Sequence, residues 1–382
     1  MSDRELTLPS SDTHAARRHL GAALVRLVHD LQRAPLPSEP IAAADARAVL
    51  ALVGPLSRAQ PGVVWAALRR PSVYTHLRLA ADRHPDPAVL LTGLTTFAAE
   101  LAASGALGEP LVIQRPPPRL LLRSRLEEVR PSPEAPLRLE RSGALLQRGS
   151  PCPRRAGFLP ISHGLALALA DDNPLASVEA HPDKSGSGLD LGEAPAERWL
   201  ASLEASLAMV ERALPELREE LELVLSTIVP VGTHDQRHLS ASYREALGTI
   251  YLSLHPQVLT MAEAVVHEAQ HNKLHAVLME DPLLQNGPDE RYPSPVRPDP
   301  RPLLGVLLAA HAFVPVALLH RSLQRLGDPA VSAPPARARL AAIVTGNAEG
   351  LALLERYGRP TPLGAALLRG LRELHEECAS SG

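Results

Sequence analysis

The sequence contains few cysteines and no long apolar run. Two cysteines, Cys152 and Cys378, in 382 residues exclude a disulfide framework and a cysteine-based zinc cluster, and they indicate a reducing compartment. No apolar stretch approaches the ~20 residues of a membrane span. The first residues, MSDRELTLPSSD, lack the basic and apolar regions of a signal peptide. We therefore expect a cytoplasmic protein with no membrane partner.

An excess of charge of one sign is also missing. The formal net charge is −3, and the basic residues are scattered along the chain, so electrostatics give no reason to expect a nucleic-acid partner. Arginine outnumbers lysine 37 to 2, a compositional bias from which no function follows. The hydrophobic content of 45% is ample for a folded core.

The periodicity of apolar residues divides the chain into three regions. Residues 1–108 form an N-terminal helical region, with helices expected at 14–33, 41–53, 61–70 and 87–106. Residues 109–195 form a β-rich region with an exposed loop, because apolar and polar residues alternate between Pro and Gly breaks. Residues 196–382 form a helical catalytic region. The expected fold class is mainly α (α+β), with helical layers around a small, mostly antiparallel sheet.

The main chemical signal is the sequence H-E-x-x-H at residues 267–271. On a helix, His267 and His271 share one face about 6 Å apart along the axis, so both imidazoles can bind one metal ion. Glu268 can act as a general base, hydrogen-bond to a ligand, or do neither. The alternative is a buried amphipathic helix with two hydrogen-bonded histidines.

The residues before this helix predict a site for an extended peptide. Residues 248–254 (GTIYLSL) favour a strand, and an edge strand can pair with a substrate backbone. We therefore expect the metal site on a central helix that follows an edge strand. The polar segment 231–242, which includes Ser240 and Ser242, is a candidate lining of the site, and an ordinary solvated connection is the alternative.

A catalytic metal ion requires a further protein ligand. His275 lies about 12 Å from His267 along the helix and cannot share one ion with both histidines. His311 is a candidate because it lies in the apolar run LLAAHAF, where metal coordination would offset its desolvation. A hydrogen-bonded core histidine is the alternative, and His320 is a weaker candidate. A two-histidine, one-carboxylate site would instead use one of the acids Glu280, Asp281, Asp289, Glu290 or Asp299.

Three segments carry a family resemblance. They are residues 267–275 (HEAQHNKLH), 294–302 (SPVRPDPRP) and 307–313 (LLAAHAF). Together they resemble the H-E-x-x-H family of bacterial peptide-modification proteins, which accompany ribosomally made, post-translationally modified peptides and are regarded as iron(II)- and 2-oxoglutarate-dependent peptide β-hydroxylases. The resemblance covers about residues 240–315. It departs at Val296, where an aromatic residue is expected in relatives.

The resemblance implies a dioxygenase that hydroxylates a side-chain β-carbon of a precursor peptide. It implies three iron ligands: His267, His271 and His311. For 2-oxoglutarate it implies a cosubstrate site drawn from Ser240, Ser242, Arg297 and Arg301, in which one of the two arginines pairs with the far carboxylate.

Two other classes of function are consistent with the same residues. In a zinc metallopeptidase, Glu268 would be the catalytic general base that activates metal-bound water. A binding or scaffold protein with a vestigial site would bind no metal. The downstream sequence lacks the glycine and third histidine of an H-E-x-x-H-x-x-G-x-x-H run, which favours the oxygenase over one type of peptidase.

Overall fold

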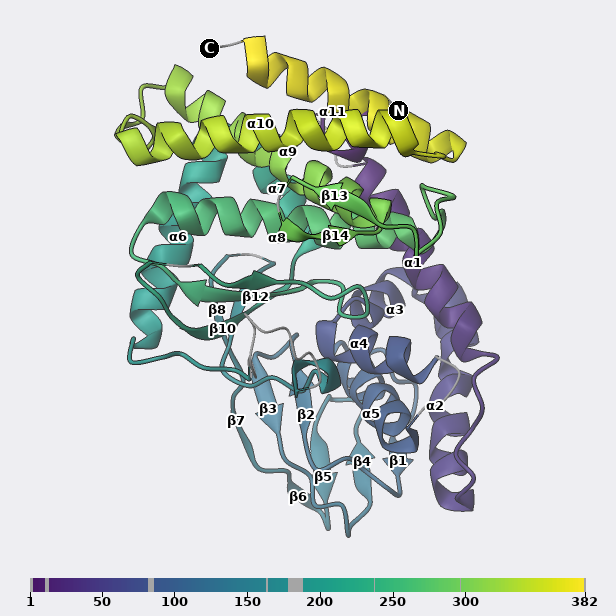
Figure 1. Cartoon of the computed structure of the whole chain (residues 1–382). Helices are drawn as coiled ribbons and strands as arrows, with labels where there is room; N and C mark the ends of the chain where they lie inside the picture. Colours follow the sequence, from purple (N-terminus) through teal and green to yellow (C-terminus); the bar gives the residue numbers. More distant parts are fainter. Residues whose placement is uncertain are drawn as a thin grey trace.

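The computed structural model describes residues 3–10, 14–81, 86–162, 164–177, 188–236, 238–295 and 297–380, without the side chains of residues 14, 297 and 298. Its helices form two groups that are separated in the chain by residues 104–195, which contain the first nine described strands (Figure 1). The first group is α1 (His14–Leu31), α2 (Pro40–Ala59), α3 (Pro61–Leu68), α4 (Pro71–Ala80) and α5 (Pro87–Ala103). The second is α6 (Ala196–Ala213), α7 (Pro215–Val224), α8 (Val258–Leu278), α9 (Leu303–Arg325), α10 (Pro334–Tyr357) and α11 (Pro362–Ser380). Many of these helices begin at a proline, which loses no hydrogen bond in the first turn.

The described strands form four small sheets. The first contains β1 (Leu111–Ile113), β4 (Leu137–Leu139), β5 (Leu145–Gln147) and β6 (Ser150–Pro151), and the second contains β2 (Leu120–Leu122), β3 (Glu127–Val129) and β7 (Arg154–Ala156). The largest has the order β11-β12-β10-β9-β8 and contains β8 (Phe158–Pro160), β9 (Ala166–Ala168), β10 (Thr227–Thr233), β11 (Ser240–Ala241) and β12 (Thr249–Leu254). A hairpin contains β13 (Tyr292–Ser294) and β14 (Arg297–Arg301).

Antiparallel pairing dominates these sheets. The pairs β9·β10 and β10·β12 are parallel, and the other pairs within the described ranges are antiparallel. The predicted fold class, mainly α (α+β) with a small and mostly antiparallel sheet, is therefore confirmed.

The predicted position of the strand before the H-E-x-x-H helix is wrong. That strand, β12, lies between β10 and β11 in the sheet, and all six of its residues are buried. Burial of every residue, Thr249 and Ser253 included, is typical of a strand with neighbours on both sides and cover on both faces. In the described part of the chain, the edge next to β12 is the two-residue strand β11.

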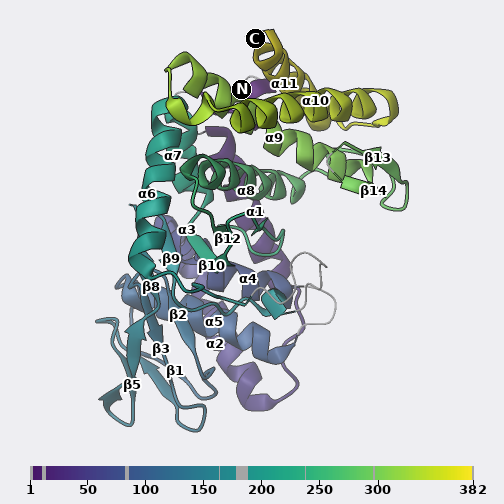
Figure 2. The same cartoon turned by 60° about the vertical axis from the view of Figure 1, so that its left-hand side comes forward.

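Helix α8 occupies a central position. It contacts α1, α6 and α9 as well as β12, and both views place it between the largest sheet and α9–α11 (Figures 1 and 2). Asn272 on α8 accepts a hydrogen bond from the backbone N–H of Gly248 at 2.8 Å. Gly248 has φ +87°, which glycine adopts without strain, so this contact fixes the start of β12 on the helix.

The N-terminal residues pack against the C-terminal helix. The 3₁₀ helix η1 (Asp3–Leu6) lies against α11, where Arg369 bonds to Asp3 at 2.7 Å and Arg4 bonds to Glu377 at 2.6 Å. A Cβ atom at Gly370 would lie 2.4 Å from the carbonyl oxygen of Asp3, so this approach requires glycine. Two further 3₁₀ helices are η2 (Pro174–Ser177) and η3 (Pro329–Val331).

Among the described residues, two helices are long and apolar enough by length and composition to cross a membrane, contrary to the expectation that no apolar stretch approaches that length. They are α2, with 28% of its most apolar window buried, and α9, with 72% buried. Burial of α9 is typical of a core helix, whereas much of the apolar surface of α2 is not covered by the described residues.

Candidate metal centre

Four elements form a pocket of about 370 Å³ around the H-E-x-x-H helix. Helix α8 contributes His267, Glu268, His271 and His275, and the end of β14 contributes Arg301. The remaining wall comes from β11 with the following serine and from one face of α9; its residues are Ser240, Ala241, Ser242, Gly305, Leu308, Ala309 and Phe313. The pocket therefore combines metal-binding side chains, a cation and an apolar wall.

The two motif histidines converge. The Nε2 atoms of His267 and His271 are 3.0 Å apart, and their ring centroids are 4.5 Å apart at an interplanar angle of 88°. With a histidine-to-metal distance of ~2.1 Å, two donors at this separation subtend an angle of about 90° at a shared ion. That angle suits neighbouring positions of an octahedral ion better than those of a tetrahedral one. The two rings hydrogen-bond to each other in this structure, and the same donor pair could hold one divalent ion such as iron(II).

Glu268 is held by the two serines that were expected in the cosubstrate site. The Ser242 hydroxyl donates to Glu268 Oε2 at 2.6 Å, and the Ser240 side chain also bonds to this carboxylate. Burial acts to raise the pKa of Glu268, but His267, His271 and the two hydroxyls outweigh it, so this pKa lies below its ordinary value. Ser240 and Ser242 thus line the pocket while they orient Glu268.

The structure does not bring His311 to the histidine pair. His311 is fully buried, and its Nε2 donates to the backbone carbonyl of Leu6 at 3.0 Å. The pocket receives Ala309 and Phe313 from α9, and a residue two positions from either is rotated by about 200° around the helix. His311 therefore points to η1 and lies beside the backbone of Gln270 on α8, near His271 but outside the pocket lining. Burial lowers its pKa to about 3, as expected for a neutral histidine in the core.

Phe313 occupies the part of α9 that faces the pair. Its ring centroid lies 4.5 Å from that of His267. The guanidinium of Arg339, a residue of α10, lies 5.6 Å from the centroid of the Phe313 ring. Sequence reasoning missed Phe313, although Gly305, Ala309 and Phe313 recur every four residues, which is the spacing of one helix face.

In the described ranges, no group of three or more His, Cys, Asp or Glu side chains is arranged to hold a metal ion.

The weaker ligand candidates also bind elsewhere. His320 is buried and lies 2.7 Å from Glu263. Glu280 bonds to His19 at 2.5 Å, Asp281 to Thr361 at 2.6 Å and Glu290 to Arg359 at 2.6 Å. Neither these acids nor Asp289 and Asp299 are among the residues that line the pocket.

His275 lines the pocket beyond the pair. Its ring is stacked on that of His271 with centroids 6.2 Å apart. Burial and the nearby His271 lower the pKa of His275 to about 3, so its imidazole is neutral. It can therefore bond to a bound ligand without adding charge.

Of the two candidate arginines, the structure places Arg301 in the pocket, where it packs beside Gly305. The side chain of Arg297 lies outside the described residues, as does Val296. Both arginines belong to β14, which pairs with β13 in a hairpin. This hairpin projects beside α9 in the second view (Figure 2).

Comparison with known proteins adds no assignment to this geometry. The sequence matches no protein-family model, and no curated protein matches it significantly.

Proposed function

We propose that this chain is an iron(II)- and 2-oxoglutarate-dependent oxygenase that hydroxylates a side-chain β-carbon of a ribosomally made precursor peptide. One observation carries the proposal: the histidine pair His267 and His271 shares a pocket with the guanidinium-bearing side chain of Arg301. Oxygenases of this class need neighbouring protein ligands for the ion and a cation for the far carboxylate of the cosubstrate.

Each residue of the pocket has a separate role in the proposed reaction. His267 and His271 would hold the ion, and Arg301 would pair with the distal carboxylate of 2-oxoglutarate. Bound iron would supply the oxidation of the peptide by O2 and 2-oxoglutarate. Phe313 and Leu308 would exclude water from the side of α9, and His275 would offer a neutral hydrogen-bonding group. The described residues that line the pocket supply these two histidine ligands, and the further protein ligand that a catalytic ion requires is not among them, because His311 bonds to Leu6 outside the pocket lining.

An extended peptide suits the edge of the largest sheet. Strand β11 pairs with β12 on one side and has no other strand beside it in the described part of the chain. Ser240 and Ala241 of this strand line the pocket. A peptide that paired with β11 would add a strand by β-augmentation and would present alternate side chains to the pocket.

The surroundings of Glu268 favour an oxygenase over a metallopeptidase. A peptidase needs this carboxylate as a base for metal-bound water. Here the carboxylate is 3% exposed, accepts bonds from two serines, and has a lowered pKa. Such a carboxylate is a weak base, so it is better suited to orienting its neighbours.

Metal binding and cosubstrate turnover test the proposal. Iron(II) should bind the wild type at one equivalent, and His267→Ala and His271→Ala should each abolish this while leaving the circular dichroism spectrum unchanged. With iron(II), O2 and 2-oxoglutarate, the wild type should release succinate. Arg301→Ala should raise the KM for 2-oxoglutarate by about ten-fold or more, as expected for loss of a charge-assisted contact. Arg291→Ala is the matched control, because Arg291 is exposed at the start of the same hairpin and does not line the pocket.

Mass spectrometry of a cognate precursor peptide separates the classes of function. The oxygenase should add one oxygen, about 16 Da, and Glu268→Gln should retain substantial hydroxylation. Peptide cleavage without 2-oxoglutarate, lost in Glu268→Gln, would instead identify a metallopeptidase. A wild type that binds no divalent metal would contradict both enzymes and indicate a binding or scaffold protein.

A further inference from the structure

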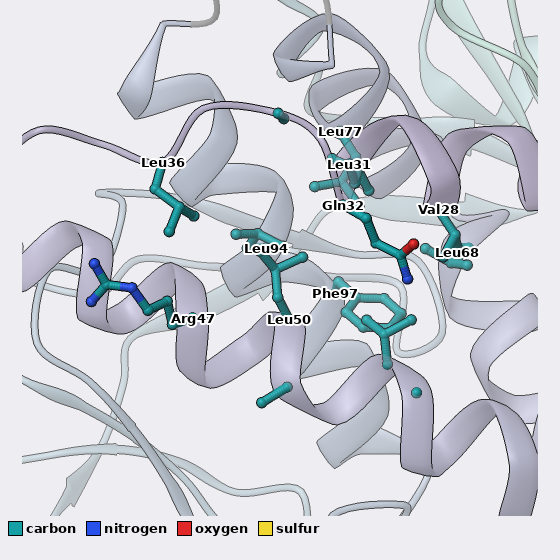
Figure 3. A pocket seen from close by; sticks show the side chains of 14 residues that line it. Val28, Leu31, Gln32, Leu36, Arg47, Leu50, Leu68, Leu77, Leu94 and Phe97 are labelled. Carbon is teal, nitrogen blue, oxygen red and sulfur yellow. The ribbon is translucent and has the colours of Figure 1, made fainter.

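A second cavity lies among the helices of the N-terminal region. It has a volume of about 480 Å³ and is lined mainly by aliphatic and aromatic side chains, including Leu50, Leu94 and Phe97 (Figure 3). It shares no lining residue with the candidate metal centre. Folded cores contain few voids larger than one water molecule, whereas small-molecule sites range from about 300 to 1,000 Å³. The cavity therefore has the size of a ligand site.

Helix α2 leaves the cavity open. Its buried face packs through small residues such as Ala46 against the neighbouring helices, while Ala51 and Gly54 line the cavity from the other face. A Cβ atom added at Gly54 would meet only the Arg58 side chain, at 3.8 Å. Larger side chains at these positions would reduce the space, so the small residues of α2 maintain it.

The cavity lining has few polar groups, and one of them, Arg47, lies at one end of the cavity (Figure 3). Among the described residues that line the cavity, only Arg47 and Gln32 carry polar side chains, and none is acidic. Figure 3 shows Arg47 below Leu36 at one end of the labelled residues, with Val28 and Leu68 at the other end. Arg47 is exposed, and within the described ranges it makes no hydrogen bond or ion pair. A guanidinium at one end of an apolar cavity is complementary to an anion that carries an apolar body.

We propose that this cavity binds an amphipathic monocarboxylate with an unbranched acyl chain of about ten carbons. A methylene has roughly the size of a water molecule, whose share of liquid volume is about 30 Å³, so ten such units need about 300 Å³. This fits within the 480 Å³ available. The chain lies against Leu50, Leu94 and Phe97, and the carboxylate pairs with Arg47. Planar bidentate pairing makes arginine well suited to a carboxylate.

A chain-length series tests the apolar part of the site. Hexanoate, octanoate, decanoate and dodecanoate are titrated into the full-length protein by calorimetry below their micelle-forming concentrations. We expect saturable binding with one site, and a Kd that falls about four-fold for each added methylene across the series, since twelve units of about 30 Å³ still fit within 480 Å³. Uptake that never saturates, or an affinity independent of chain length, would overturn the proposal.

Three variants test the position of the ligand. Arg47→Gln should weaken decanoate binding about three- to ten-fold and leave binding of the uncharged 1-decanol unchanged, because the contact is ionic but exposed. Arg17→Gln is the charge-matched control on the exposed surface of α1, outside the cavity lining. Ala51→Trp should fill the cavity and weaken both ligands by at least about ten-fold. Equal effects of Arg47→Gln and Arg17→Gln, or full binding in a folded Ala51→Trp variant, would contradict this placement.

A free carboxylate and a membrane lipid share the same acyl chemistry, so a further arm distinguishes them. The protein is sedimented with vesicles of phosphatidylcholine containing phosphatidylglycerol. We expect no Arg47-dependent sedimentation, since the cavity has room for a single acyl chain. Sedimentation with vesicles that is lost in Arg47→Gln, together with no binding of decanoate, would replace the proposed ligand by a membrane surface.

Discussion

Lys273 provides a sharp test of how α8 is anchored. It is one of only two lysines among 39 basic residues, it is 2% exposed, and it lies between the site residues His271 and His275. Its Nζ lies 2.8 and 3.0 Å from the two carboxylate oxygens of Glu220 on α7 and 2.9 Å from the carbonyl of Glu5. A fourth acceptor, the carbonyl of Thr7, is 3.3 Å away. A compact ammonium group with three donors fits these converging acceptors better than a planar guanidinium.

We predict that Lys273→Met lowers the free energy of unfolding by about 3–5 kcal/mol. The methionine fills a similar volume, but Glu220 then remains as a buried carboxylate without its cation, which is the costly way to break a buried ion pair. At about 2.1 cal/mol/K per residue, cooperative unfolding of 382 residues has an entropy near 0.8 kcal/mol/K. The melting temperature should therefore fall by about 4–6 °C.

The control is Arg369→Met, which also removes an ion pair to the N-terminal segment. Arg369 is 58% exposed on its side chain, so its loss should cost at most about 1 kcal/mol. Adding Glu220→Gln to Lys273→Met should restore part of the stability, since no uncompensated charge is left. Calorimetric melting of the four proteins is the assay. A Lys273→Met melting temperature equal to that of Arg369→Met, or a double variant less stable than Lys273→Met, would refute the electrostatic argument.

Three further predictions follow from buried titratable groups. His311→Ala should lower the free energy of unfolding by about 2–4 kcal/mol, since it opens a cavity and leaves the Leu6 carbonyl without its donor. The variant should still bind one equivalent of metal. Loss of the metal from a folded variant would restore His311 as a ligand. His275→Ala should also retain the metal, as measured by elemental analysis, because its position on α8 cannot share an ion with both His267 and His271. Burial and the adjacent Asp172 raise the pKa of Asp171 from 3.8 to about 6, so its stabilising contribution is complete below about pH 4 and is lost as the pH rises through 6. Between pH 4 and 7, wild type should lose about 2 kcal/mol relative to Asp171→Asn, and parallel melting curves across that range would reject the buried environment.

Much of the helical framework follows from local sequence. The expected helix at 14–33 corresponds to α1 (His14–Leu31), and that at 87–106 corresponds to α5 (Pro87–Ala103), because an apolar stripe every three to four residues specifies a helix without knowledge of its partner. Helix α4 (Pro71–Ala80) was not predicted. Within the region 196–382, which was expected to be helical, α7 ends at Val224 and Thr227–Thr233 forms β10. Strand formation there depends on pairing with β9 and β12, which local preference does not specify.

The residues of the candidate site also fall into those that local sequence places and those that tertiary packing places. Four-residue spacing on one helix brings His267 and His271 together, so the sequence by itself determined this pair: both lie on α8, where helix geometry alone sets their separation. The position of His311 depended on the rotation of α9 about its axis, which is set by packing of α9 against α8 and η1. Apolar neighbours in the sequence predicted that His311 is buried, but burial does not specify which buried face it occupies. Only the tertiary structure decided that Phe313 faces the pair, that Ser240 and Ser242 hold Glu268, and that His311 bonds to the N-terminal segment, because each contact joins residues far apart in the chain.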